Sequence, residues 1–153
     1  MTWIRQKLAS CNERIACHEA GKAWSYAEFI RLIDQAAKQV PNKGAAVIDV
    51  QAPTTIEALA MIIAIGESGH IALPLPAELP EADQDKRRLI AKSSQLYNQL
   101  EGSGLVLFSS GTSGEPKGML HNLDALLGRY KNLSARKDRS LLLLLIDHIG
   151  GLD

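Results

Sequence analysis

The sequence has few cysteines, no excess of charge of either sign and no long apolar run. Two cysteines are too few for a disulfide framework, and 17 lysine and arginine residues balance 17 aspartate and glutamate residues. This balance gives no reason to expect binding to nucleic acid or to an anionic membrane surface. The longest apolar runs, residues 58–65 and 141–146, are much shorter than the roughly 20 residues that cross a bilayer.

The N-terminal sequence MTWIRQKLASCNER lacks the continuous apolar segment of a secretory signal. Cys11 and Cys17 fall in a segment that we predict to be helical, where their spacing places them on different sides. We therefore expect two reduced thiols in a cytoplasmic protein, and no metal site.

What is present is the composition of an ordinary folded domain. Hydrophobic residues make up 46% of the chain and charged residues 22%. A chain of 153 residues suggests one domain, which can bury about 70% of the surface that its unfolded form exposes. That is enough for a hydrophobic core.

The first quarter of the chain shows mainly helical spacing of apolar residues. We predict an amphipathic helix over residues 1–18 and a short extended piece at Trp24. Ser25 and Glu28 have the spacing of a capping box, in which each side chain accepts a hydrogen bond from the other's free backbone N–H. The helix that begins there should stop at Pro41.

The next segment has the order strand, helix, strand. Thr54 and Glu57 suggest a second capping box, and Gly66 and Gly69 should end the helix that follows. The predicted elements are a strand over residues 45–50, a helix over 58–65 and a strand over 71–73. Such a βαβ unit requires parallel strands and a right-handed crossover.

Beyond residue 73 the alternation continues. We predict a proline-rich loop at residues 74–80, a helix within 81–100, a strand over 105–108, a helix over 123–130 and a strand over 141–146. The charged cluster at residues 83–88, near the start of the helix within 81–100, is predicted to be a solvated helix start. Together the elements predict an α/β fold with a mostly parallel sheet layered with helices.

The segment with the clearest chemical signal is SSGTSGEPKG, residues 109–118, at the end of an apolar strand. Gly111 and Gly114 allow backbone N–H groups to turn toward a ligand, and Lys117 adds a mobile positive charge. Four hydroxyls add short donors, from Ser109, Ser110, Thr112 and Ser113. A polyphosphate needs several directed donors and a cation. The alternative is a solvated turn between two elements.

The same segment does not match other phosphate-binding patterns. The pattern GxxxxGK[ST] would require glycine at Pro116 and a hydroxyl residue at Gly118, and no GxGxxG spacing is present. The segment instead resembles the phosphate loop of the adenylate-forming superfamily, in which an apolar strand leads into [ST]SG[ST][ST]GxPKG. Acyl- and aryl-CoA ligases and the adenylation domains of peptide synthetases belong to this superfamily.

Other segments extend the resemblance over nearly the whole chain. The sequence from Trp24 to Glu28 resembles the entrance of the family's first long helix, and Lys117 to His121 resembles its KGVxxxH continuation. The segment DHIGG, which contains His148, resembles the next motif. There, Leu145 replaces a usual proline and Asp147 a usual aromatic residue, which weakens any inference about the acyl pocket.

The resemblance implies roles for individual residues. Thr112, Ser113 and Gly114 would contact the β- and γ-phosphates of ATP, and Ser109, Ser110, Gly111 and Lys117 would complete the cradle. His148 would lie beside the carboxylate of the acid substrate. An equally good interpretation of His148 is a histidine at a strand end that is bonded to a backbone carbonyl. His121 is expected just before a helix rather than as a ligand.

The resemblance also implies the parent activity. Such enzymes join a carboxylic acid to ATP, with Mg²⁺, and transfer the acyl group to CoA or to a carrier-protein phosphopantetheine. Residues 1–153 would be a partial N-terminal AMP-binding domain of an acid–thiol ligase. The ribose-binding aspartate and the catalytic lysine of the C-terminal domain have no counterpart in this sequence, so we expect no catalytic residue here and no activity of the chain alone.

Two further expectations concern the chain by itself. The alternative function is a non-catalytic nucleotide- or protein-binding α/β module that shares the fold. The five leucines from Leu141 to Leu145 predict an apolar strand, and an uncovered apolar strand edge favours self-association.

Overall fold

The computed structural model describes residues 2–42, 44, 46–51, 54–93, 103–110 and 115–132. Its centre is a four-stranded sheet in the order β3 (Val47–Gln51), β4 (Ile71–Leu75), β5 (Gly104–Ser110) and β6 (Pro116–Asn122). The pairings β3–β4 and β4–β5 are parallel, and β5–β6 is antiparallel. The prediction of a mostly parallel α/β sheet is confirmed, and the predicted strand over residues 141–146 lies outside the described residues.

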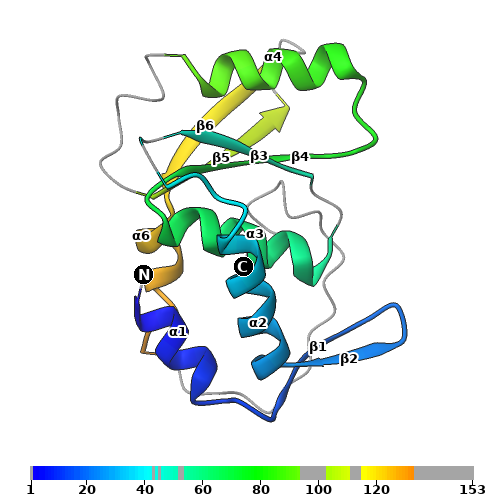
Figure 1. The fold of residues 1–153 in the computed structure, drawn as a ribbon. Coiled ribbons are helices and arrows are strands. Elements are labelled where there is room, and N and C mark those ends of the chain that lie inside the picture. The colour runs from blue at the N-terminus through cyan, green and yellow to red at the C-terminus, as the bar shows by residue number, and fades with distance from the viewer. Residues whose placement is uncertain are drawn as a thin grey trace.

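Helices cover both faces of the sheet, as Figure 1 shows: α4 (Glu81–Ala91) on one side, and α2 (Tyr26–Ala37) with α3 (Ile56–Glu67) on the other. The side chains of β5 alternate accordingly. Leu105 and Leu107 join the apolar cluster of α2 and α3, whereas Val106 and Phe108 join the cluster on the α4 side. This two-sided burial explains why the strand reads as a continuous apolar run.

The first capping box is confirmed. The backbone N–H of Ser25 donates to Oε2 of Glu28 over 2.8 Å, and the backbone N–H of Glu28 donates to the Ser25 hydroxyl over 3.2 Å. The Ser25 hydroxyl also donates to Oε2 of Glu28, over 3.0 Å. The two bonds that this carboxylate accepts, the one from the Ser25 backbone N–H first, lower the pKa of the Glu28 carboxyl. Helix α2, which begins at this capping box, ends at Ala37, a few residues before Pro41.

The prediction of a second capping box from Thr54 and Glu57 names the wrong residues. Thr55 rather than Thr54 caps α3, accepting from the backbone N–H of Ala58 over 3.2 Å. The carboxylate that accepts from the backbone N–H of Ile56, over 3.0 Å, belongs to Glu19 and not to Glu57. Glu19 lies far away in the sequence, and only the folded hairpin brings it to this helix.

The predicted helix over residues 1–18 is also wrong beyond its first half. Helix α1 runs over Thr2–Ala9, and β1 (Ile15–Glu19) pairs antiparallel with β2 (Lys22–Ser25). Ala20 and Gly21 both have positive φ, 47° and 80°, as a two-residue hairpin turn of this hand requires. Pairing with β2 therefore overrides the helical spacing. Cys17 lies in a strand, and both cysteines are free thiols.

Several element boundaries differ from the prediction. Helix α3 continues through Gly66 to Glu67, and the chain turns at Gly69, whose φ is +76°. Strand β4 continues through Pro74 to Leu75 rather than giving way to a loop, because parallel pairing with β3 extends to Gln51. Within the described ranges, no helix has both the length and the apolar character needed to cross a membrane.

Candidate functional site

The segment predicted to be a phosphate loop, residues 109–118, begins at the end of β5 and ends within β6. Antiparallel pairing places Ser109 opposite Lys117 and Ser110 opposite Pro116. Three of the predicted site residues, Ser109, Ser110 and Lys117, are therefore brought together at one edge of the sheet. The others, Gly111, Thr112, Ser113, Gly114 and His148, lie outside the described residues.

This edge is where parallel strands of an α/β sheet commonly bind ligands. Strands β3, β4 and β5 run in the same direction, so their carboxyl ends share the edge at which Ser109 lies. Ligands of such sheets bind outside the carboxyl ends of the strands. The Ser109 hydroxyl and the Lys117 ammonium therefore lie at the carboxyl ends of the parallel strands, where a ligand is expected.

Ser109 and Lys117 face the same side of the sheet, because directly opposed residues of an antiparallel pair share a face. That side is also the side of Leu105 and Leu107, which pack on α2 and α3. Ser109 is half-buried and Lys117 is exposed. The lysine ammonium is therefore free of the core and accessible to an anion, while the serine is anchored at the strand end.

Strand β6 was not predicted, since the segment after the glycine-rich loop was expected to lead into a helix. Pro116 and Gly118 both argue against a strand by propensity. In the structure Pro116 is the first residue of β6, one of the positions where a strand tolerates proline. Leu120 packs toward α4 while Lys117 and Met119 are exposed, so a period-2 pattern was the available signal.

The end of β6 passes directly into α6 (Leu123–Gly128). Asn122 caps that helix, accepting from the backbone N–H of Ala125 over 2.8 Å, and His121 lies just before the cap, as expected. His121 pairs with Leu105 at the opposite end of the strand from Lys117. It is therefore not part of the candidate site.

Hydrogen bonds join helix α1 to α6 and to the residues that follow it. Lys7 Nζ donates to the carbonyl oxygens of Tyr130 and Lys131, over 2.8 and 3.1 Å, just beyond the end of α6. Trp3 Nε1 donates to Asp124 over 3.0 Å. The segment that follows β6 is thus fixed to the N-terminal helix.

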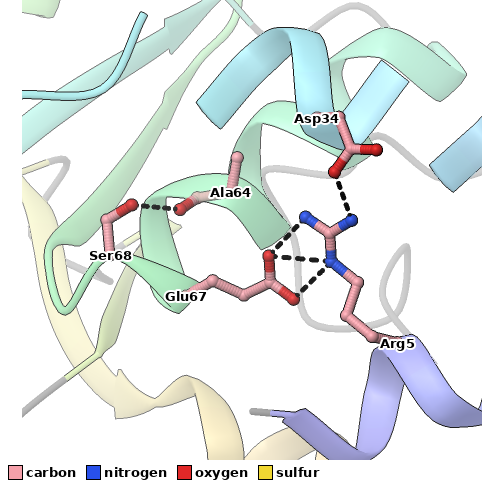
Figure 2. A network of polar contacts seen from close by, with 5 residues as sticks. All are labelled: Arg5, Asp34, Ala64, Glu67 and Ser68. Atoms are coloured by element: carbon pink, nitrogen blue, oxygen red, sulfur yellow. Dashed lines mark hydrogen bonds and ion pairs between the residues drawn. The ribbon is translucent and has the colours of Figure 1, made fainter. Parts of the chain in front are cut away.

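The same helix is joined to α2 and α3 through Arg5. Figure 2 shows its guanidinium between the carboxylates of Glu67 and Asp34, with Nη2–Oε2 and Nη1–Oδ1 distances of 2.7 and 2.6 Å. The hydrogen bonds to Glu67 are the largest of the interactions that raise the pKa of Arg5. Sequence reasoning missed this cluster because its members are widely separated along the chain.

The charged cluster on α4 is only partly the solvated face that was predicted. Arg88 is half-buried and donates to Asp49 of β3 and Asp85 of α4, over 2.6 and 2.7 Å. Arg87, also half-buried, places its guanidinium carbon 4.9 Å from the centre of the Phe108 ring. Lys86 remains exposed. Two of the five charges therefore contact the sheet.

The donor set does not suggest a resident metal in this part of the chain. Among the residues that the structure describes, no three His, Cys, Asp or Glu side chains are grouped closely enough to hold a metal ion. A hard cation such as Mg²⁺ would need carboxylate, phosphate or water oxygens from elsewhere.

Comparison with known proteins gives structural matches only. No protein-family model matches the chain, and no curated protein sequence matches it. O-succinylbenzoate CoA synthetase of Bacillus subtilis, in complex with its acyl-adenylate intermediate, matches with a TM-score of 0.70 and 19% identity, over 98% of this chain and 51% of that one. The same enzyme with ATP and magnesium matches with a TM-score of 0.68 and 18% identity, over 98% and 52%.

A second protein gives the same result. The N-terminal subdomain of Klebsiella oxytoca NpsA, in complex with 3-hydroxyanthranilyl-AMSN, matches with a TM-score of 0.60 and 18% identity, over 78% of this chain and 39% of that one. The chain spans about half the length of the CoA synthetase in the complexes with acyl-adenylate and with ATP. The expected fold is confirmed: this chain shares its fold with part of the CoA synthetase and with the NpsA N-terminal subdomain.

Proposed function

We propose that this chain is the N-terminal, phosphate-loop portion of an ATP-dependent acyl-activating enzyme. The parent reaction joins a carboxylic acid to ATP, giving an acyl-adenylate and pyrophosphate, and then transfers the acyl group to the thiol of CoA or of a carrier protein. The observation that carries the proposal is the pairing of Ser109 with Lys117 at the carboxyl edge of the sheet. This pairing makes residues 111–115 the connection between two hydrogen-bonded strands.

The chemistry of the first step explains the composition of that connection. The α-phosphorus is attacked by the carboxylate oxygen, and the bond to the leaving oxygen breaks with negative charge developing on pyrophosphate. A cation and several N–H and O–H donors stabilise that charge as it forms. Lys117 supplies the cation, and Ser109, Ser110, Thr112 and Ser113 supply hydroxyls. When bound with ATP, Mg²⁺ neutralises part of the phosphate charge.

The acid substrate is a separate part of the proposal. His148 is the residue we assign beside the carboxylate, and this residue lies outside the described part of the chain. The ligands named in the similar structures include the acyl-adenylate of o-succinylbenzoate and 3-hydroxybenzoyl-AMSN, each with a benzoate-derived acyl group. Benzoates are therefore the first acids to test.

The test is carboxylate-dependent exchange of pyrophosphate into ATP, measured on the longer protein of which we propose this chain to be part. We expect exchange with at least one acid of a broad panel, a loss of about tenfold or more in Lys117→Ala, and little change in Lys38→Ala, an exposed lysine after α2. The chain of 153 residues alone should give no exchange. Absence of exchange across the panel would contradict the proposal.

We also propose that the isolated chain self-associates through the apolar segment from Leu141 to Leu145, which lies outside the described residues. Replacing Leu143 by lysine should lower the association, since charge on an exposed strand opposes edge pairing. Light scattering measures it. A monomer at high concentration in the unsubstituted chain would contradict this expectation.

A further inference from the structure

The position of Arg87 over Phe108 places a second cation next to the phosphate-loop segment. Its guanidinium carbon is 4.9 Å from the ring centre, within the range of a cation–π contact. Phe108 is 4% exposed and is the last apolar residue before Ser109. The contact is thus made at the base of the segment and not on a remote surface.

The pairing of β5 with β6 relates this contact to the candidate site. Phe108 is opposite Gly118, and the next pair along the strands is Ser109 with Lys117. The ring faces α4, whereas Ser109 and Lys117 face the side of α2 and α3. The end of β5 is therefore flanked by Arg87 on one face of the sheet and by Lys117 on the other.

The neighbours of Arg87 on α4 are engaged differently. Arg88 is bonded to Asp49 and Asp85, and Lys86 is exposed without a ring beneath it. Arg87 is the cation of this helix whose guanidinium lies over a ring of the strand that leads into the loop. A guanidinium suits this place, because it is planar, weakly hydrated and able to stack on an aromatic face.

We propose that Arg87 is a positioning residue for the phosphate loop. Its guanidinium holds the Phe108 ring, and with it the end of β5, so that Ser109 and Lys117 keep their register when a polyphosphate binds. This inference rests on the proposed function, because it assigns the residue a part in the same binding event. Arg87 acts through Phe108 and not as a ligand of the phosphates.

The experiment titrates magnesium pyrophosphate into the 153-residue chain by calorimetry. Circular dichroism first confirms that each variant is folded under the conditions used. Arg87→Met keeps the apolar stem and should weaken pyrophosphate affinity about fivefold. Arg87→Lys keeps the charge above the ring and should recover part of that loss. Lys86→Met, which removes one charge from the neighbouring exposed position, should leave the affinity unchanged.

A double-mutant cycle tests whether the effect runs through the ring. In Phe108→Leu, the further change Arg87→Met should have no added effect on affinity. If the two changes are instead independent, Arg87 does not act through Phe108 and the inference is wrong. Should Phe108→Leu fail to fold, the comparison of Arg87→Met with Arg87→Lys and Lys86→Met still decides the matter.

The remaining outcomes separate this inference from the proposed function. An unchanged affinity in Arg87→Met, with or without a lower melting temperature, would overturn the positioning role if Lys117→Ala still weakens binding. Failure of the unsubstituted chain to bind pyrophosphate at all would overturn both.

Discussion

Arg5 of α1 and Glu67 of α3 form a two-nitrogen ion pair, in which Nε and Nη2 donate to the carboxylate over 2.8 and 2.7 Å. Both side chains are less than a third exposed, at 28% and 20%. A third nitrogen reaches Asp34 of α2. One side chain near the N-terminus therefore joins three helices that lie on the same side of the sheet.

Replacing Arg5 by methionine should lower the free energy of unfolding by about 1–2 kcal/mol. The change leaves the half-buried Glu67 carboxylate without its partner. Ion pairs that are bidentate and little exposed contribute more to the free energy of unfolding than exposed surface pairs do. Urea unfolding measures the loss. Arg31→Met is the matched control, since Arg31 is exposed on α2, and it should change stability by less than about 0.5 kcal/mol. Equal effects in the two variants would contradict the assignment.

The cap of α3 offers a direct comparison between two glutamates. Glu19→Ala removes the acceptor of the Ile56 N–H and should destabilise the chain by about 1 kcal/mol. Glu19→Gln keeps an acceptor oxygen and should retain most of the stability. Glu57→Ala tests the residue that the sequence pattern favoured, and should have a smaller effect than Glu19→Ala. Thermal or urea unfolding measures both losses of stability. A larger loss in Glu57→Ala than in Glu19→Ala would favour Glu57, the residue that the sequence pattern predicted, as the capping residue.

Glu28 should make the stability of the chain depend on pH. Hydrogen bonds from Ser25 lower the pKa of its carboxyl below the ordinary value of 4.5. The contribution is therefore complete above about pH 4.5 and is lost as the pH falls through the lower, folded-state value. Glu28→Gln keeps an acceptor but no charge. Its stability difference from the unsubstituted chain should be present at pH 7 and shrink at pH 3, and a difference that is constant with pH would contradict this.

Burial should slow the reaction of Cys17 with thiol reagents. Partial burial, followed by the charges of Glu19 and Glu57, raises the pKa of this thiol above its ordinary value of 9.0. In a Cys11→Ser background, the rate of iodoacetamide labelling should keep rising above pH 9.0. A plateau below that pH would show that the thiol is not shielded in this way.

Local patterns predicted the parts of the fold that depend on neighbouring residues. The Ser25–Glu28 box and the parallel βαβ unit with its apolar strands follow from spacing along a short stretch of chain. The hairpin with its turn at Ala20–Gly21 does not follow from local spacing, which favours a helix there. It depends on the pairing of the segment at Ile15 with the segment at Ser25. Nor does local spacing predict the Glu19 cap, which joins residues far apart in the sequence.

The candidate site divides in the same way. The composition of residues 109–118 indicated a phosphate loop, and the structure adds that Lys117 lies in a strand opposite Ser109. The contact between Arg87 and Phe108 could not be predicted, since it requires α4 to lie on a particular face of β5. Period-2 spacing of Lys117, Met119 and His121 was the one available signal for β6.

The segment between Ser109 and Lys117 is proposed to bind a polyphosphate. Calorimetric titration of the 153-residue chain with magnesium pyrophosphate or ATP tests it most directly. We expect saturable binding that weakens about 10- to 100-fold in Lys117→Ala, the loss of one charge-assisted contact, and that is unchanged in Lys38→Ala. Binding that is absent in the unsubstituted chain, or equal in Lys117→Ala, would contradict the claim.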